Sequence, residues 1–162
     1  AIANGGKVLR PRIATRIETY DGKVLERMAP EVLRTLDIDA EHLAAVREGL
    51  RQVVNHPTGT AFRKRLEDVE VAGKTGTAQV RKMGDRRKSR RAEWKYKDHA
   101  WFAAFAPARD PQVVVVVFNE HGGGGSRSAA PIAMRVIEAW RAIERRVAER
   151  AGTADRLAEA GP

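Results

Sequence analysis

The sequence predicts an α/β (α+β) fold in which helices flank an antiparallel sheet. Two apolar stretches, at 99–106 and 113–119, are separated by a short turn with a proline at each end, which is the pattern of an antiparallel hairpin. A third strand is predicted at 69–80, which opens as an alternating run of β-branched residues. Apolar residues at helical spacing predict flanking helices at 40–55 and 129–150.

Composition limits the chemistry that the chain can carry. Its 162 residues suit one domain, and its apolar fraction is enough for a core. There is no cysteine, which excludes disulfides and thiolate metal sites, and we predict neither a metal nor an organic cofactor. The longest unbroken apolar run, at 113–118, is too short to span a bilayer.

The first residues have the form of the last turn and C-cap of a helix whose body is missing, since 1–6 end in two glycines and the chain opens on alanine. We therefore expect the carboxyl-terminal piece of a longer protein. The polar stretch 7–25 predicts a hairpin, with Asp21 and Gly22 at its turn. Asp39 is a suitable N-cap for the helix at 40–55, and turn-forming residues end that helix at 57–60.

The strand at 69–80 contains residues that are poorly suited to a core. They are Gly73, Lys74, Thr75, Gly76 and Thr77. Lysine supplies a positive charge with three donors, and threonine hydroxyls suit a carboxylate or an oxyanion. Glycine within a strand indicates that something approaches the backbone closely. A phosphate-binding loop would need glycine where Asp68 stands, so we interpret the strand as one wall of a different kind of site.

The stretch 81–97 carries nine Lys or Arg against two acidic residues. With little periodicity, it predicts a solvated loop between strands. Contact with an acidic polymer or an anionic lipid surface is an alternative. Nucleic acid is the weakest alternative, because only Trp94 and Tyr96 offer stacking faces and no nucleic-acid fold signature surrounds them.

The rest of the chain predicts a covered hairpin and a long helix. Apolar residues on both faces of 99–106 are typical of a strand that is covered on both sides. The glycine run 122–125 predicts a flexible connection, with an anion-binding nest as the alternative. Ser128 can cap the helix at 129–150, whose apolar stripe should lie on the sheet. Residues 151–162 are predicted to form a flexible tail.

Several segments, in this order, resemble class B penicillin-binding proteins. They are 1–6, 54–61, the Lys-Thr-Gly box at 72–79, 98–107 and 119–123, before an Ala-Pro helix start. The resemblance extends over nearly all of the chain to about residue 145. It implies that 1–150 form the C-terminal portion of a transpeptidase domain with the fold of penicillin-binding proteins and serine β-lactamases. β-Lactamases and β-lactam sensors share the box, but the segments around His99 and His121 favour the synthetic enzymes.

The resemblance implies a D,D-transpeptidase that binds penicillin and cross-links peptidoglycan stem peptides through a serine acyl-enzyme. Lys74 and Thr77 would be catalytic: Lys74 through its positive field, Thr77 through a backbone N–H that forms half of the oxyanion hole. The hydroxyls of Thr75 and Thr77 would bind the terminal carboxylate of the stem peptide or of a β-lactam. Gly76 would leave room for an extended peptide along the strand.

The nucleophile of that family is missing from the chain. Neither Ser89, Ser126 nor Ser128 begins a Ser-x-x-Lys motif, so we predict that the chain cannot acylate by itself. The implied partners are stem peptides, β-lactams and the rest of the transpeptidase domain. The implied location is the periplasmic face of the bacterial inner membrane, with an anchor outside this chain. A function of a different class is a non-catalytic module that binds a polyanion through 81–97.

Overall fold

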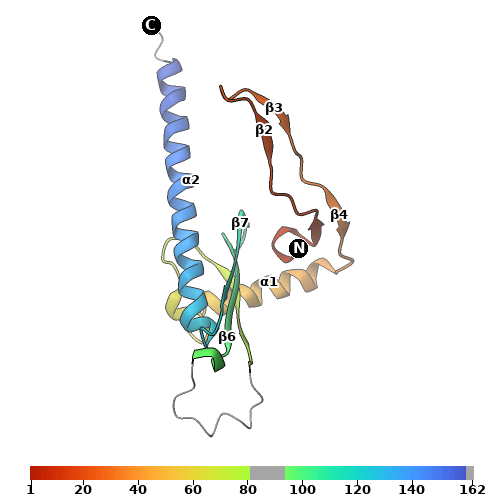
Figure 1. The fold of residues 1–162 in the computed structure, drawn as a ribbon, viewed down its shortest axis with the longest axis vertical. Helices are drawn as coiled ribbons and strands as arrows, with labels where there is room; N and C mark the ends of the chain where they lie inside the picture. The colour runs from red at the N-terminus through yellow and green to blue at the C-terminus, as the bar shows by residue number, and fades with distance from the viewer. Residues whose placement is uncertain (81–93, 160–162) are drawn as a thin grey trace. The chain divides into compact units, whose positions relative to one another are not determined.

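The structure is a computed structural model that describes residues 1–80 and 94–159 (Figure 1). It divides into two compact units, Ala1–Arg47 and Glu48–Pro162. Helix α1 (Ala40–Asn55) runs across the boundary between them. Each unit has its own strand pairing, and the predicted site residues all belong to the second unit.

The first unit consists of two small antiparallel pairs. Strand β2 (Arg16–Glu18) pairs with β3 (Val24–Arg27) around a turn in which Gly22 has φ +86°, so the predicted hairpin is confirmed. Strand β1 (Lys7–Leu9) pairs with β4 (Val32–Thr35), a pairing that the sequence did not predict. The 3₁₀ turn Ile2–Asn4 ends at Gly5, which has the left-handed conformation of a helix C-cap.

The second unit contains a three-stranded antiparallel sheet in the order β5–β6–β7. Strands β6 (His99–Ala106) and β7 (Val113–Asn119) have the predicted bounds. Strand β5 (Ala72–Ala78) is shorter than the predicted 69–80. Before it, the oxygen of Glu70 accepts the N–H of Ala108 and that of Val71 accepts the side-chain amide of Asn55. These bonds take the place of a strand ladder.

Helix α1 has its predicted bounds, and its Asp39 cap is confirmed because the Asp39 carboxylate accepts the N–H of Glu41 at 2.9 Å. Helix α2 (Ala130–Glu159) differs from the prediction of 129–150 at both ends. A π-helical turn, η5 (Gly125–Ala129), precedes it, and the Ser128 hydroxyl donates to Gly124 O instead of capping α2. Beyond 150, the helix-forming Ala, Arg, Leu and Glu outweigh one glycine.

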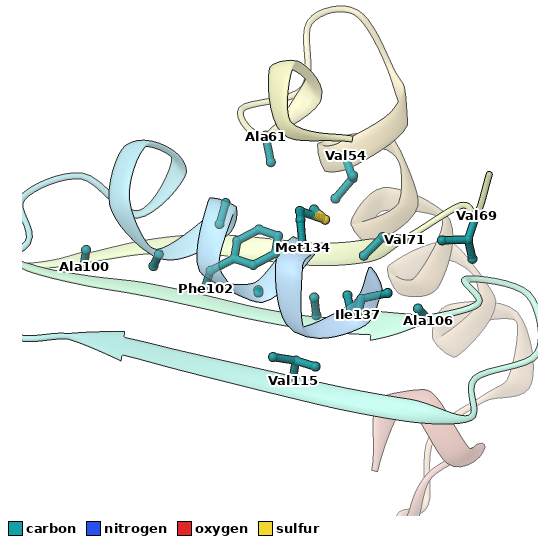
Figure 2. Packing of buried hydrophobic residues seen from close by; sticks show 14 residues of the cluster. Val54, Ala61, Val69, Val71, Ala100, Phe102, Ala106, Val115, Met134 and Ile137 are labelled. Carbon is teal, nitrogen blue, oxygen red and sulfur yellow. The ribbon is translucent and has the colours of Figure 1, made fainter. Parts of the chain in front are cut away.

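The core of the second unit lies between one face of the sheet and α2. Phe102 on β6 is fully buried, and its side chain lies beside Met134 of α2 (Figure 2). Small residues on both elements, including Ala104 and Ala133, let the helix backbone approach the sheet. Burying a side chain of the size of Phe contributes about 1.5–3 kcal/mol. This packing fixes the position of α2 on the sheet.

The opposite face of the sheet is uncovered over most of its length in the described chain, and we call its exposed part the open face. Trp101 is 40% exposed and Val116 is 60% exposed. The prediction that β6 is covered on both sides therefore fails at Trp101 and Ala103 within this structure and holds at Phe105, which is 6% exposed. The residues of the open face are Trp101, Ala103, Val114, Val116 and Phe118.

The turn η5 approaches the backbone of β5 so closely that only glycine fits. Gly125 is buried, and a Cβ atom there would lie 2.6 Å from Gly76 O and would also overlap Trp101 O. Because both neighbours are backbone atoms in the sheet, neither can move cheaply. Gly125, the last glycine of the 122–125 run, therefore has a packing role. The predicted flexible connection did not include such a role.

An ion-pair network joins α1 to the segment that leads into β5. Arg51 donates to both carboxylate oxygens of Glu48, at 2.8 and 2.9 Å, and to Glu70 at 2.6 Å. Hydrogen bonds from Arg51, followed by one from Gln52, lower the pKa of Glu48 from its usual 4.5 to about 2. The same carboxylates raise the pKa of Arg51.

Because of this network, we predict that the free energy of unfolding falls at acidic pH, and that Glu48→Gln makes this pH dependence smaller. Because the folded pKa of Glu48 lies below its usual value, the stabilisation is complete above about pH 4.5 and is lost as the pH falls toward about 2. Urea unfolding midpoints between about pH 5 and pH 2 should fall more for the unmodified chain than for Glu48→Gln. Glu138→Gln, on the exposed face of α2, is the matched control. Parallel curves for all three chains would contradict the prediction.

The close approach at Gly125 predicts a sharp contrast between neighbouring glycines. Gly125→Ala should lower the free energy of unfolding by about 1–3 kcal/mol, because the new methyl group overlaps backbone atoms of β5 and β6. Gly124→Ala should change it by less than about 0.5 kcal/mol, because its φ of −90° suits alanine and its Cβ would meet no atom within 4 Å. Equal urea midpoints for the two variants would show that η5 does not pack on β5 in this way.

Candidate functional site on strand β5

Strand β5 lies at the edge of its sheet. Within the described residues it pairs with β6 alone, so its other edge has no strand partner. An edge strand presents free backbone N–H and C=O groups to which an extended peptide can bind. The candidate residues Lys74, Thr75, Gly76 and Thr77 stand in the middle of this strand.

Strand alternation separates the four candidate side chains into two pairs. Thr75 and Thr77 lie opposite Phe102 and Ala100, so their side chains are on the face that α2 covers. Lys74 and Gly76 lie opposite Ala103 and Trp101, on the open face. Thr77 and Lys74 are nevertheless exposed. The structure thus brings the two hydroxyls together and places the lysine side chain on the other side of the strand.

The lysine ammonium returns to the strand backbone. Lys74 Nζ donates to the backbone oxygen of Thr75 at 2.8 Å. In an antiparallel strand, the N–H and C=O of one residue point to the same edge, and alternate residues share that edge. The Thr75 oxygen that binds the ammonium and the N–H of Thr77 therefore point the same way. This arrangement can offer a positive charge and a backbone donor to one anionic group.

A further hydroxyl, from Thr60, belongs to the site, and sequence reasoning missed it. Thr60 Oγ1 lies 3.0 Å from Thr75 Oγ1. Its turn is fixed because Ala61 N–H donates to Val53 O and because a Cβ at Gly59 would overlap the end of α1. The prediction of a turn at 57–60 is confirmed, but a turn signal does not reveal a partner in β5. The one available signal is that residues 58–60 repeat the Thr-Gly-Thr of 75–77.

Two histidines join the ends of β6 and β7. His121 N–H donates to His99 Nδ1 at 3.0 Å, so this nitrogen of His99 must be unprotonated. His121 Nδ1 lies 2.9 Å from Lys97 O, and because a carbonyl only accepts, this nitrogen carries a proton. His121 also has φ +52°, a conformation that is rare outside glycine. The pair fixes the chain that leads from β7 toward η5.

The remaining predictions concern metal ions, the membrane and polyanions. Among residues 1–80 and 94–159, no cluster of three or more His, Asp or Glu could hold a metal ion. Within the same described residues, no helix has an apolar stretch that could span a bilayer. Most of the basic loop, at 81–93, lies outside the described residues, so polyanion binding by 81–97 stays a prediction.

The chain is similar to known proteins in both sequence and structure. The penicillin binding protein transpeptidase domain family matches residues 1–138. The peptidoglycan D,D-transpeptidase MrdA of Haemophilus influenzae is 41% identical over 144 residues, which is 85% of this chain and 21% of that protein. This chain therefore spans about a fifth of the length of the curated relatives that it matches.

Solved structures agree with this match and confirm the predicted fold class. Penicillin-binding protein 2 of Pseudomonas aeruginosa, in complex with WCK 5153, is similar with a TM-score of 0.64 and 35% identity, over 86% of this chain and 27% of that chain. Penicillin-binding protein A of Mycobacterium tuberculosis, as its imipenem acyl-enzyme, has a TM-score of 0.61 and 28% identity over 85% of this chain and 28% of that chain. The chain belongs to the penicillin-binding protein transpeptidase domain family, as a class B member of the penicillin-binding protein 2 type.

Proposed function

We propose that this chain is the C-terminal part of a peptidoglycan D,D-transpeptidase domain and supplies one wall of its substrate site. The observation that carries the proposal is the exposed edge strand β5. On it, the Lys74 ammonium, bound to Thr75 O, lies at the edge to which the N–H of Thr77 points, and the hydroxyls of Thr75 and Thr77 share one face. The assignment to this reaction is supported by similarity to a D,D-transpeptidase, which is 41% identical over 144 residues.

Each residue of the wall has a chemical task in the proposed reaction. The hydroxyls of Thr75 and Thr77 bind the terminal carboxylate of a stem peptide that ends in D-Ala-D-Ala, or the carboxylate of a β-lactam. The N–H of Thr77 donates to the oxyanion that forms when the acyl group is attacked, and one such donor is worth about 2.7–4 kcal/mol. Lys74 adds a positive field. Gly76 has no side chain, so an extended peptide can approach the strand.

Other parts of the domain complete this site in the proposal. Acyl transfer needs a nucleophile and a base together with the oxyanion donors, and none of the serines in the chain starts a Ser-x-x-Lys motif. The rest of the transpeptidase domain would supply both groups and would cover the open face. The exposure of Val114 and Val116, at about 60% each, supports such cover. The parent protein would act at the periplasmic face of the inner membrane.

Fluorescent penicillin tests the proposed function. The protein made from the whole gene, with whatever precedes Ala1, should be labelled covalently. The 162-residue chain alone should not be labelled, because it lacks the nucleophile motif. In the whole protein, Lys74→Ala should lower the rate of labelling by about a hundredfold, the usual effect of losing one preorganised electrostatic group. In-gel fluorescence against time gives both rates.

The matched control is Lys23→Ala, which removes an exposed lysine from a turn of the first unit and should label normally. Equal labelling of the Lys74→Ala and Lys23→Ala proteins would contradict the role given to the wall. Loss of the fluorescent label within minutes would instead indicate a β-lactamase. A synthetic transpeptidase should keep its β-lactam acyl group much longer than that.

A further inference from the structure

A pair of histidines at the end of the sheet lies next to the wall on β5 and has no task in the proposed function. His99 begins β6 and lies opposite Ala78, the residue that follows Thr77. His121 lies in the segment between β7 and η5, and the centroid of its ring is 4.6 Å from that of the His99 ring. The pair therefore stands where β5, β6 and the segment toward η5 meet.

The segment that links β7 to η5 is held on the start of β6 by hydrogen bonds from His121 and Gly123. His121 N–H donates to His99 Nδ1 at 3.0 Å, and the His121 ring donates from Nδ1 to Lys97 O at 2.9 Å. Gly123 N–H donates to Asp98 O at 2.8 Å. Of these acceptors, only the imidazole nitrogen can take up a proton near neutral pH, so one of the bonds depends on pH.

The backbone of His121 has a conformation that needs such support. Its φ of +52° lies in the left-handed region, which is unfavourable for residues other than glycine and persists only where the surrounding structure enforces it. The hydrogen bond to His99 supplies part of that enforcement, because it uses the N–H of this same residue. Without the bond, the backbone at His121 should relax and move the segment that leads into η5.

The segment ends at η5, which supports the wall directly. Gly125, the first residue of η5, lies so close to β5 that a Cβ atom there would be 2.6 Å from Gly76 O and 2.9 Å from Gly76 N. Gly76 lies between Thr75 and Thr77, so a shift of η5 changes the backbone that carries both hydroxyls and the proposed oxyanion donor. A displacement of about 1 Å at a reacting group can cost about a hundredfold in rate.

The two histidines respond differently to acid. A proton on His99 Nδ1 removes the acceptor of the His121 N–H and places two donors face to face. The His121 ring already donates from Nδ1, and its Nε2 lies 3.9 Å from a carboxylate oxygen of Glu120, so a second proton on this ring breaks no bond. The other ionisable residues on the neighbouring elements are Lys74, Lys95, Tyr96, Lys97, Asp98 and Arg127. Their charges affect the pH at which His99 becomes protonated but not the bond that is then lost.

We propose that His99 is a positioning residue for the proposed transpeptidase reaction and acts only while its imidazole is neutral. The inference rests on the proposed function, because the wall that His99 supports is the one described there. His99 acts without touching the substrate: it holds His121, and through the following segment and η5 it holds Gly76. The rate of acylation should therefore fall as the pH drops through the range in which histidine becomes protonated, from about pH 8 to about pH 5.

The substitution His99→Asn tests the proposal, because the side-chain oxygen of asparagine can accept a hydrogen bond in place of Nδ1 and does not become protonated in this range. The measurement is the rate of labelling by fluorescent penicillin, in the protein made from the whole gene, from about pH 8 to about pH 5. Over this range, the rate of the unmodified protein should fall about three- to tenfold more than that of His99→Asn, as expected for the loss of one hydrogen bond.

Two further variants complete the labelling experiment. His99→Ala has no acceptor for the His121 N–H, so it should be labelled slowly at every pH. His42→Asn changes an exposed histidine of α1 in the first unit and should keep the pH profile of the unmodified protein.

A second measurement needs neither a variant nor activity. In the 162-residue chain, NMR follows the ring signals of His99 and the backbone amide signals of Gly76, Thr77 and Gly125 against pH. The amide signals should change with the same midpoint as the His99 ring. In the His99→Asn chain, this change should be absent.

The outcomes separate this inference from the proposed function. Amide signals of Gly76 and Thr77 that do not follow the titration of His99 would overturn the positioning role, and so would equal pH profiles for the unmodified protein and His99→Asn. Labelling of His99→Asn that is as slow as that of His99→Ala at every pH would also overturn it, because the ring would then act by packing. Each of these results leaves the proposed function standing. If the whole protein is not labelled at any pH, the proposed function fails, and the role of His99 in that reaction fails with it.

Discussion

The contact between helix α2 and the small residues of β6 is the constraint on which the second unit depends. Ala100 and Ala104 on the strand, with Ala130 and Ala133 on the helix, leave space for the larger side chains of Phe102, Met134 and Ile137. Because α2 lies this close to the sheet, the turn η5 that precedes it must cross β5 at backbone distance. Gly125 makes that crossing possible. The position of the candidate site on β5 is thus set by packing between two other elements.

Sequence patterns predicted the helices and strands of this unit correctly where their formation depends on neighbouring residues alone. The apolar runs of β6 and β7 and the Asp39 cap of α1 depend on neighbouring residues only, and their bounds agree with the structure. The patterns failed where a distant partner decides. Residues 69–71 resemble a strand, but their carbonyl groups bind Asn55 and Ala108. Whether both faces of β6 are covered likewise depends on which other elements pack on them, and the periodic pattern of the strand does not predict those elements.

The candidate site shows the same division. The box at 72–79 names the residues of the proposed wall, and strand alternation, applied strictly, also predicts that Lys74 lies across the strand from Thr75 and Thr77. Thr60 could not be found in this way, because its hydroxyl reaches Thr75 only through the fold of the intervening segment. Arg63 and Lys64 are adjacent in sequence and Arg127 is more than sixty residues away, and the three line one pocket only because η5 packs on β5.

In the proposed function, β5 accepts a peptide at its edge, and such an edge is also exposed to unwanted pairing with other strands. Two glycines and a lysine lower this risk, because glycine is a poor strand former and a charged side chain at the edge opposes another strand. Lys74 places its ammonium on a carbonyl of its own strand, which occupies one of the groups that a foreign strand would use. A ligand with a carboxylate can attract that ammonium, whereas a neutral strand cannot. In the proposed function, the charge that protects the edge therefore also favours a ligand with a carboxylate.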